Sequence, residues 1–451
     1  MKPSSRFLAI AALAVAASST SSYFTLQASE NIRIASLREP RAPVPAYAPD
    51  KVIVQFAHDA TDADAGRVGR EAGAARMRRG AFAGRYLLTL DAGFTVAEAL
   101  DRLRSRPEVE YAEPDMIYRA FQARRVTPND NLFQFQWHWQ LIDAPRAWAI
   151  QTGDASVVVA VLDTGIAYEN FGPYRRAPDF GTTTFVQGFD FVNNDTHAND
   201  DNFHGTHVAS TIAESTNNGT GGAGLAFNTA LMPVKVLDSE GFGDSFTIAE
   251  GIDFAIGNAG VKVINMSLGG EGTSATIAAA VTRAVQRGVT VVAAAGNENS
   301  SNVGFPANLS NVIAVGAVDG RKIRAPYSNF GSALDVVAPG GDLRRDDVGP
   351  DLRPDGRPDG ILQQTFDPDT AAETGRYDDF AYFFVVGTSQ ATPHVAALAA
   401  LLYHQGITTP AAIQAAIENS AEDLGAPGRD DQYGHGLIRP AAALTGLGVN
   451  R

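Results

Sequence analysis

Long apolar runs alternate with amphipathic stretches over the C-terminal two thirds of this chain. Five runs predict buried strands: VVVAVLD (157–163), LMPVKVLD (231–238), KVINMSL (262–268), VTVVAAAG (289–296) and VIAVGAV (312–318). Three stretches between them predict helices: THVASTIAES (206–215), TIAEGIDFAIGNA (247–259) and ATIAAAVTRAVQRG (275–288). The alternation predicts a doubly wound α/β domain, a mostly parallel sheet with helices on both faces. Functional residues then belong at the carboxyl ends of its strands.

The region before this domain has a different pattern of shorter strands and helices. Three runs predict strands: VIVQF (52–56), RYLLTLD (85–91) and VEYAEPD (109–115). Two predict helices: ADAGRVGREAGA (63–74) and TVAEALDRLRSR (95–106). Thr95 and Glu98 have the spacing of a capping box. We therefore expect a small α+β domain of ferredoxin-like type.

Composition excludes several classes of protein. Of 451 residues, 45% are hydrophobic and 19% charged, which is typical of a globular chain. From residue 126 onward 18 Lys and Arg face 36 Asp and Glu, so this part would repel nucleic acid. The chain has no Cys, which excludes disulfides, thiol nucleophiles and zinc–thiolate sites. An exported protein without disulfides needs another means of stabilisation, and bound calcium is a common one.

The N-terminus resembles an export signal. Lys2 and Arg6 precede an apolar run from Phe7 to Ala17 that is too short to span a bilayer. We expect a signal peptide (1–28), a Pro-rich linker (29–50), the small domain (51–121) and the large domain (122–451). The product would be secreted, either extracellular or periplasmic, with no membrane span.

Four residues could carry chemistry at the strand ends of the large domain. Asp163 ends the first strand, His204 opens a helix in HGTHVAS, Asn297 follows VVAAAG, and Ser389 stands at the start of a helix in GTSQATPHVAALAALL (387–402). Each alone has an ordinary interpretation as a turn or cap residue. Asp, His and Ser in one α/β domain are the parts of a nucleophilic triad. We also expect Thr206 to cap the helix that follows His204.

The blocks VLDTGI, HGTHVAS, AAAGN and GTSQATPHVA, in this order, resemble the subtilisin-like serine proteases. The resemblance covers about residues 128–442 and implies peptide-bond hydrolysis through an acyl-enzyme. Ser389 would be the nucleophile, His204 the general base and Asp163 its orienting partner. Asn297 and the Ser389 amide would bind the oxyanion.

The resemblance extends to substrate-binding segments. SLGG, which is Ser267, Leu268, Gly269 and Gly270, resembles the wall of the first specificity pocket. GFGDS, with Gly241 and Gly243, resembles the strand that pairs with substrate, and Gly304 corresponds to the pocket floor. A small residue there implies a preference for a large hydrophobic side chain.

The small domain resembles the propeptide of the same family, an intramolecular chaperone and inhibitor. The block YAEPDMIYRAF (111–121) places self-cleavage after Phe121, with a later cut after Arg125 as the alternative. We expect a monomeric endopeptidase of broad specificity that acts on proteins or peptides. The alternatives are a maturation protease with few substrates and an inactive relative that only binds partners.

Three residues match calcium ligands of the family. They are Asp130 in PNDNLF, Asp179 in APDF and Asn218 in NNGTGGAG. Oxygen donors from three segments would join the N-terminal stretch to the body of the domain and hold a structural Ca²⁺. The alternative is that all three lie in plain surface turns.

The sequence departs from the family pattern at several positions. Phe203 replaces the usual Gly before His204, and Gln390 replaces the oxidation-sensitive Met after Ser389, which predicts slow inactivation by peroxide. Residues 341–382 form an insertion. Within it DLRPDGRPD (351–359) resembles a calcium loop, but Arg353 is unfavourable there and a solvated acidic loop is the default.

Overall fold

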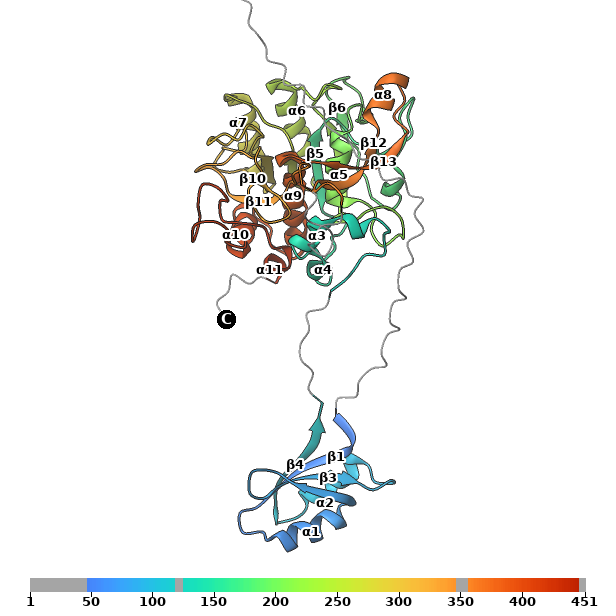
Figure 1. Ribbon diagram of the computed structural model, residues 1–451, viewed down its shortest axis with the longest axis vertical. Coiled ribbons are helices and arrows are strands. Elements are labelled where there is room, and N and C mark those ends of the chain that lie inside the picture. Colours follow the sequence, from blue (N-terminus) through green and yellow to red (C-terminus); the bar gives the residue numbers. More distant parts are fainter. Residues whose placement is uncertain (1–46, 118–124, 346–355, 446–451) are drawn as a thin grey trace, which may run out of the picture. The chain divides into compact units, whose positions relative to one another are not determined.

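The computed structural model describes residues 47–117, 125–345 and 356–445. The chain divides into two compact units, residues 31–123 and a larger unit that contains residues 124–451 (Figure 1). The predicted signal peptide, the predicted cleavage point after Phe121 and residues 351–355 of the insertion lie outside the described residues. No helix in the described part of the chain is long and apolar enough to cross a membrane.

The small unit has the predicted α+β architecture. Its elements are β1 (Tyr47–Phe56), α1 (Asp62–Glu71), β2 (Ala74–Arg79), β3 (Arg85–Leu90), α2 (Val96–Arg104) and β4 (Val109–Met116). The antiparallel sheet has the order β2-β3-β1-β4. β2 was not predicted because its sequence, AARMRR, is polar and lies at the sheet edge. β1 begins within the stretch predicted to be linker.

The helix caps and the buried core of this unit agree with the sequence pattern. Thr95 and Glu98 form the predicted capping box of α2, and Thr61 with Asp64 forms a second one on α1. Val52, Val54 and Leu88 are fully buried between the sheet and the helices. The unit therefore has a hydrophobic core of its own.

The large unit is built on a seven-stranded parallel sheet of order β11-β10-β9-β8-β5-β7-β6. Its strands are β5 (Val158–Asp163), β6 (Phe189–Asp190), β7 (Ala230–Lys235), β8 (Val261–Met266), β9 (Thr290–Ala294), β10 (Ile313–Val318) and β11 (Val336–Pro339). The five predicted strands are all present, and all but one of their residues are buried. The doubly wound fold is confirmed.

Helices cover this sheet in pairs (Figure 1). The larger ones are α5 (His204–Ala213), α6 (Ser245–Ala255), α7 (Ala275–Gln286), α9 (Thr388–His404) and α10 (Pro410–Ser420). α5 packs against α9 and α6 against α7, while α9 also contacts β8, β9, β10 and β11. The shorter helices are η1 (Phe133–Phe135), α3 (Trp137–Leu141), α4 (Ala144–Ala147), η2 (Pro178–Phe180), α8 (Pro368–Thr374) and α11 (Pro440–Leu444).

The predicted insertion is partly an ordered hairpin. β12 (Ile361–Phe366) pairs antiparallel with β13 (Phe380–Val385), and α8 lies between them in sequence. The hairpin packs on α5: Thr365 Oγ1 donates to the Phe203 carbonyl at 2.8 Å, and Ser210 Oγ donates to the Gln364 carbonyl at 3.1 Å. The hairpin thus holds the helix that begins at His204.

Candidate active site

Asp163 is the last residue of β5 and is fully buried. Its Oδ1 accepts hydrogen bonds from the Thr164 amide at 2.8 Å and from His204 Nδ1 at 2.7 Å. The amides of Val236 and Leu237, just beyond β7, donate to the Asp163 carbonyl. The carboxylate is therefore fixed by the central sheet.

His204 is the first residue of α5, and about one fifth of its side chain (21%) is exposed. Burial lowers the pKa of its imidazole, but the carboxylates of Asp163 and Asp200 outweigh burial and raise that pKa above its ordinary value. With Nδ1 engaged by Asp163, Nε2 is the nitrogen available to take a proton.

The predicted capping role of Thr206 is wrong. Phe203 is the N-cap of α5, and its side chain makes no capping hydrogen bond. Asp200 performs this function, because its Oδ2 accepts from the Thr206 amide at 2.9 Å and from the Thr206 hydroxyl at 2.6 Å, while Oδ1 accepts from the Phe203 amide. Asp200 also accepts from the Thr164 hydroxyl, which links the His204 turn to the end of β5.

Ser389 lies in the first turn of α9, as predicted. Its Oγ donates to the Ser267 carbonyl at 3.1 Å, and the Ser267 hydroxyl donates back to the Ser389 carbonyl at 2.8 Å. Among the described residues no hydrogen bond joins Ser389 to His204, so proton transfer requires the serine hydroxyl to leave Ser267. Catalytic hydrogen bonds commonly tighten only once substrate is bound.

Two hydrogen-bond donors converge beside Ser389. Asn297 Oδ1 accepts from the Thr388 amide at 2.9 Å and from its hydroxyl at 3.0 Å, which fixes the opposite orientation of Nδ2. A Cβ atom placed on Gly387 would lie 3.6 Å from both Asn297 Nδ2 and the Ser389 amide nitrogen. Gln390 Oε1 would lie closer still, at 2.7 Å, so only a residue without a side chain fits between these groups.

Of the predicted substrate-binding segments, SLGG lies next to Ser389. Ser267 contacts Ser389 directly, and Gly270 exchanges two backbone hydrogen bonds with Phe305, the neighbour of Gly304. Gly269 also lies close to the Phe305 carbonyl. Gly241 and Gly243 flank the largely exposed Phe242 in the turn before α6.

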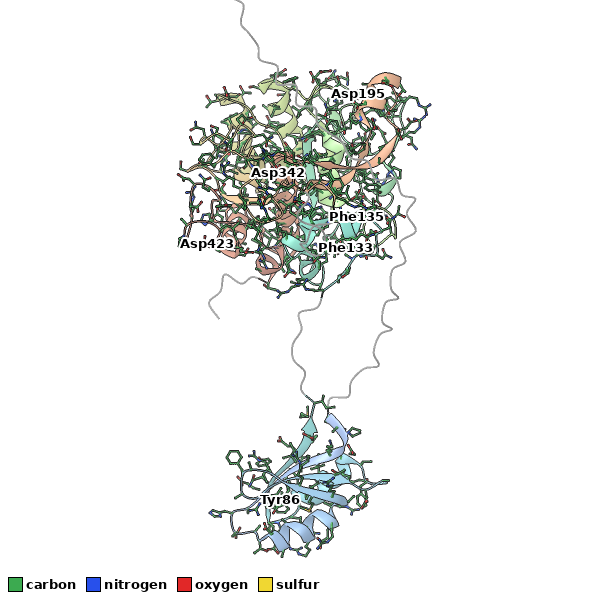
Figure 2. All side chains as sticks on the ribbon, in the orientation of Figure 1. Tyr86, Phe133, Phe135, Asp195, Asp342 and Asp423 are labelled. Carbon is green, nitrogen blue, oxygen red and sulfur yellow. The ribbon has the colours of Figure 1, made fainter. Side chains whose placement is uncertain are left out.

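The structure brings the three predicted calcium ligands together. Asp130 accepts from the backbone amides of Asn217 and Asn218 at 2.8 and 3.0 Å, and Asn218 Nδ2 donates to Asp179 Oδ1 at 2.6 Å. Asp130 and Asp179 are buried, so the reading as plain surface turns does not hold for them. Phe133 and Phe135 of η1 (Figure 2) pack inward and anchor the segment that carries Asp130.

The chemistry of this site fits a hard cation. Burial raises the pKa of Asp179 to about 7 and also raises that of Asp130. No cationic side chain of the described residues forms an ion pair with either. No three His, Cys, Asp or Glu side chains in the described ranges converge closely enough to hold a metal alone. Carboxylate, amide and backbone oxygens together would be the donors, as calcium prefers.

Three supporting residues were not identified from the sequence. Asp200 and Thr388 hold His204 and Asn297 in place. Lys235, at the end of β7, is fully buried and donates to Asp201 and to the carbonyls of Thr164 and Leu237. Of these three, only Asp200 could have been found from the sequence, because it is a residue type that commonly caps helices and it stands shortly before one.

The departures from the family pattern have structural counterparts. Phe203 has a φ of 100°, a conformation that non-glycine residues rarely adopt. Gln390 is buried, and its Nε2 has no hydrogen-bond partner among the described residues. The second histidine of this motif, His207, is buried in α5, and its Nε2 contacts the carbonyls of Ile361 and Phe383.

Known proteins match both units of the chain. Residues 154–436 match the model of the subtilase family, and residues 35–115 match that of the fervidolysin N-terminal prodomain. A thermophilic serine proteinase of Bacillus sp. (strain AK1) is 37% identical over 86% of either chain. Thermitase of Thermoactinomyces vulgaris is 37% identical over 67% of this chain and 94% of its own length.

Solved structures agree with these matches. A protease from Pseudoalteromonas arctica PAMC 21717 superimposes with a TM-score of 0.62 and 34% identity, covering 71% of this chain and 99% of that one. The family match spans more than half of the present chain and includes the segments that position Asp163, His204, Asn297 and Ser389. The chain is a member of the subtilase family of serine peptidases, with an N-terminal prodomain.

Proposed function

We propose that this protein is a secreted endopeptidase of broad specificity in which Ser389, His204 and Asp163 form the catalytic triad. The observation that carries the proposal is the 2.7 Å contact between His204 Nδ1 and the buried Asp163, in a fold whose helix α9 has Ser389 in its first turn. His204 Nε2 takes the proton of Ser389 as its oxygen attacks the peptide carbonyl, and returns it to the leaving amine. Water then hydrolyses the acyl-enzyme by the same route.

The oxyanion is stabilised by Asn297 Nδ2 and the Ser389 amide. Both donors lie close to Gly387, and Thr388 keeps the Asn297 amide in one orientation. Donors fixed in advance toward developing negative charge lower the barrier without reorganisation. The absence of a side chain at Gly304 supports a preference for large hydrophobic residues before the cleaved bond.

The N-terminal unit would inhibit the enzyme until it is cut away after Phe121. The prodomain match supports this role, and extracellular or periplasmic release follows from the predicted signal peptide. Calcium held by Asp130, Asp179 and Asn218 would supply positive charge to a buried anionic site and stabilise the mature domain. We further propose that the mature enzyme acts as a monomer.

The test is to purify the wild type and Ser389→Ala side by side, followed by N-terminal sequencing and a casein assay. A shortened wild type that digests casein, beside an uncut and inert variant, supports the triad, self-processing and broad specificity. Two full-length inert proteins in the presence of calcium would overturn the proposal. A processed wild type that leaves casein intact would instead favour a maturation protease with few substrates.

A further inference from the structure

Glu214 is a buried carboxylate that the proposed catalytic mechanism does not use. It is the C-cap residue of α5 and is fully buried. Neither of its carboxylate oxygens forms a hydrogen bond of normal geometry with any described residue. Buried polar groups without partners are rare and costly, so this one needs a physical explanation.

Glu214 faces the loop that carries Asn218. A Cβ atom on Gly222 would lie 2.6 Å from Glu214 Oε2, and the Gly222 amide donates to Asp179 Oδ2 at 3.1 Å. Glu214 and Asp179 therefore approach the same short stretch of backbone. Gln136 Nε2 would lie 2.8 Å from the same Cβ position, but it donates to other acceptors.

Three buried carboxylates consequently lie around this loop without compensating charge, although they do not converge closely enough to hold a metal by themselves. Asp130, Asp179 and Glu214 come from three separate segments, and no Lys, Arg or His of the described residues forms an ion pair with them. Burial and the two aspartates hold the pKa of Glu214 well above its usual range, and the Gln364 amide offsets this only in part. An unpaired buried charge is destabilising, and a divalent cation would balance it.

We propose that Glu214 contributes a third buried negative charge to the calcium site and thereby strengthens cation binding. The inference rests on the proposed calcium site at Asp130, Asp179 and Asn218.

The test is calorimetric titration of calcium into the full-length, calcium-stripped chain that carries Ser389→Ala to prevent self-digestion. Glu214→Gln in this background removes the charge with little change in shape, and the matched control Glu373→Gln makes the same change on the exposed face of α8. We expect Glu214→Gln to raise the Kd for calcium about tenfold or more, because a buried charge acts strongly at short range. The control should match the parent.

The outcomes separate the two proposals. If the parent binds no calcium, the calcium site itself fails. If the parent binds calcium and Glu214→Gln binds it within twofold of the parent, the site stands and the role of Glu214 is overturned. If Glu214→Gln does not fold, Glu214→Asp decides: a Kd close to that of the parent supports the charge, and a loss of about tenfold despite the retained charge contradicts it.

Discussion

The active site and the loop at residues 214–224 differ in how their buried charges are balanced. At the active site Asp163 is paired with His204, and Asp200 accepts hydrogen bonds from Thr164, Phe203 and Thr206. At the loop, Asp130, Asp179 and Glu214 have no cationic partner among the described residues. The proposed catalytic groups are thus held by partners within the chain, whereas a cation is the partner that we propose for the loop.

The largest effect that we expect is the loss of kcat caused by Asn297→Ala at the active site. Loss of one oxyanion donor should lower kcat about 10²–10³-fold, about 3–4 kcal/mol, a magnitude known from subtilisin itself. The calcium dependence of unfolding should not change. Steady-state kinetics on a peptide substrate, with the exposed Asn302→Ala as control, measure the effect. A kcat close to that of the wild type would remove Asn297 from the oxyanion site.

Asp179→Asn should change the calcium dependence of stability and leave kcat unchanged. The variant is expected to lose the stabilisation that calcium confers, about 2.7 kcal/mol at a calcium concentration a hundred times Kd. Its kcat at 25 °C should stay near that of the wild type while the protein is folded. Thermal unfolding with calcium and with EDTA measures this. A large calcium-induced rise in Tm that survives in the variant would contradict the assignment.

Phe203 allows a matched pair of substitutions next to the catalytic histidine. Glycine normally destabilises a folded chain relative to alanine, but at a φ of 100° the order should reverse. We expect Phe203→Gly to be more stable than Phe203→Ala by about 1 kcal/mol, because both lose the ring and only alanine keeps the strain. Urea unfolding measures the free energy of unfolding of both variants. A glycine variant less stable than the alanine variant would show that the backbone at this position is not strained.

The smallest effect that we expect is a shift of the pH profile caused by the raised pKa of His204. Its raised pKa means that the acid limb of kcat/KM should lie above pH 6.5, since the base is lost as pH falls through that pKa. NMR of Ser389→Ala can follow the imidazole directly. Buried His207 and His394 serve as internal controls, because burial lowers their pKa to about 4 and about 3. A midpoint for His204 below 6.5 would contradict the prediction.

Sequence reasoning found the parts of this molecule that leave a periodic or clustered signal. The strands that end at Asp163 and before Ser267 and Asn297 are continuously apolar, so their positions and the parallel sheet followed directly. β2 was missed because an exposed edge strand needs no apolar face. The pairing of β12 with β13 depends on contacts with α5 that no local pattern encodes.

The supporting residues of the site were harder to find for a related reason. Lys235 lies inside an apolar run and gives no sign that it is fully buried, since its partners come from Asp201, Thr164 and Leu237. Glu214 similarly ends an apolar helix as an ordinary acidic residue. Their significance depends on which groups the fold brings near them, and only three-dimensional packing settles that.

The central position of α9 has a consequence for the timing of activity. This helix carries Ser389 and packs against five strands of the parallel sheet, yet it comes after almost nine tenths of the chain in sequence. Contacts between residues so distant in sequence form late and slowly. A growing or partly folded chain therefore has no assembled nucleophile, whereas the small N-terminal unit, with its own core, can fold first. With Ser389 as the proposed nucleophile, this order of folding would keep unfinished molecules from digesting one another.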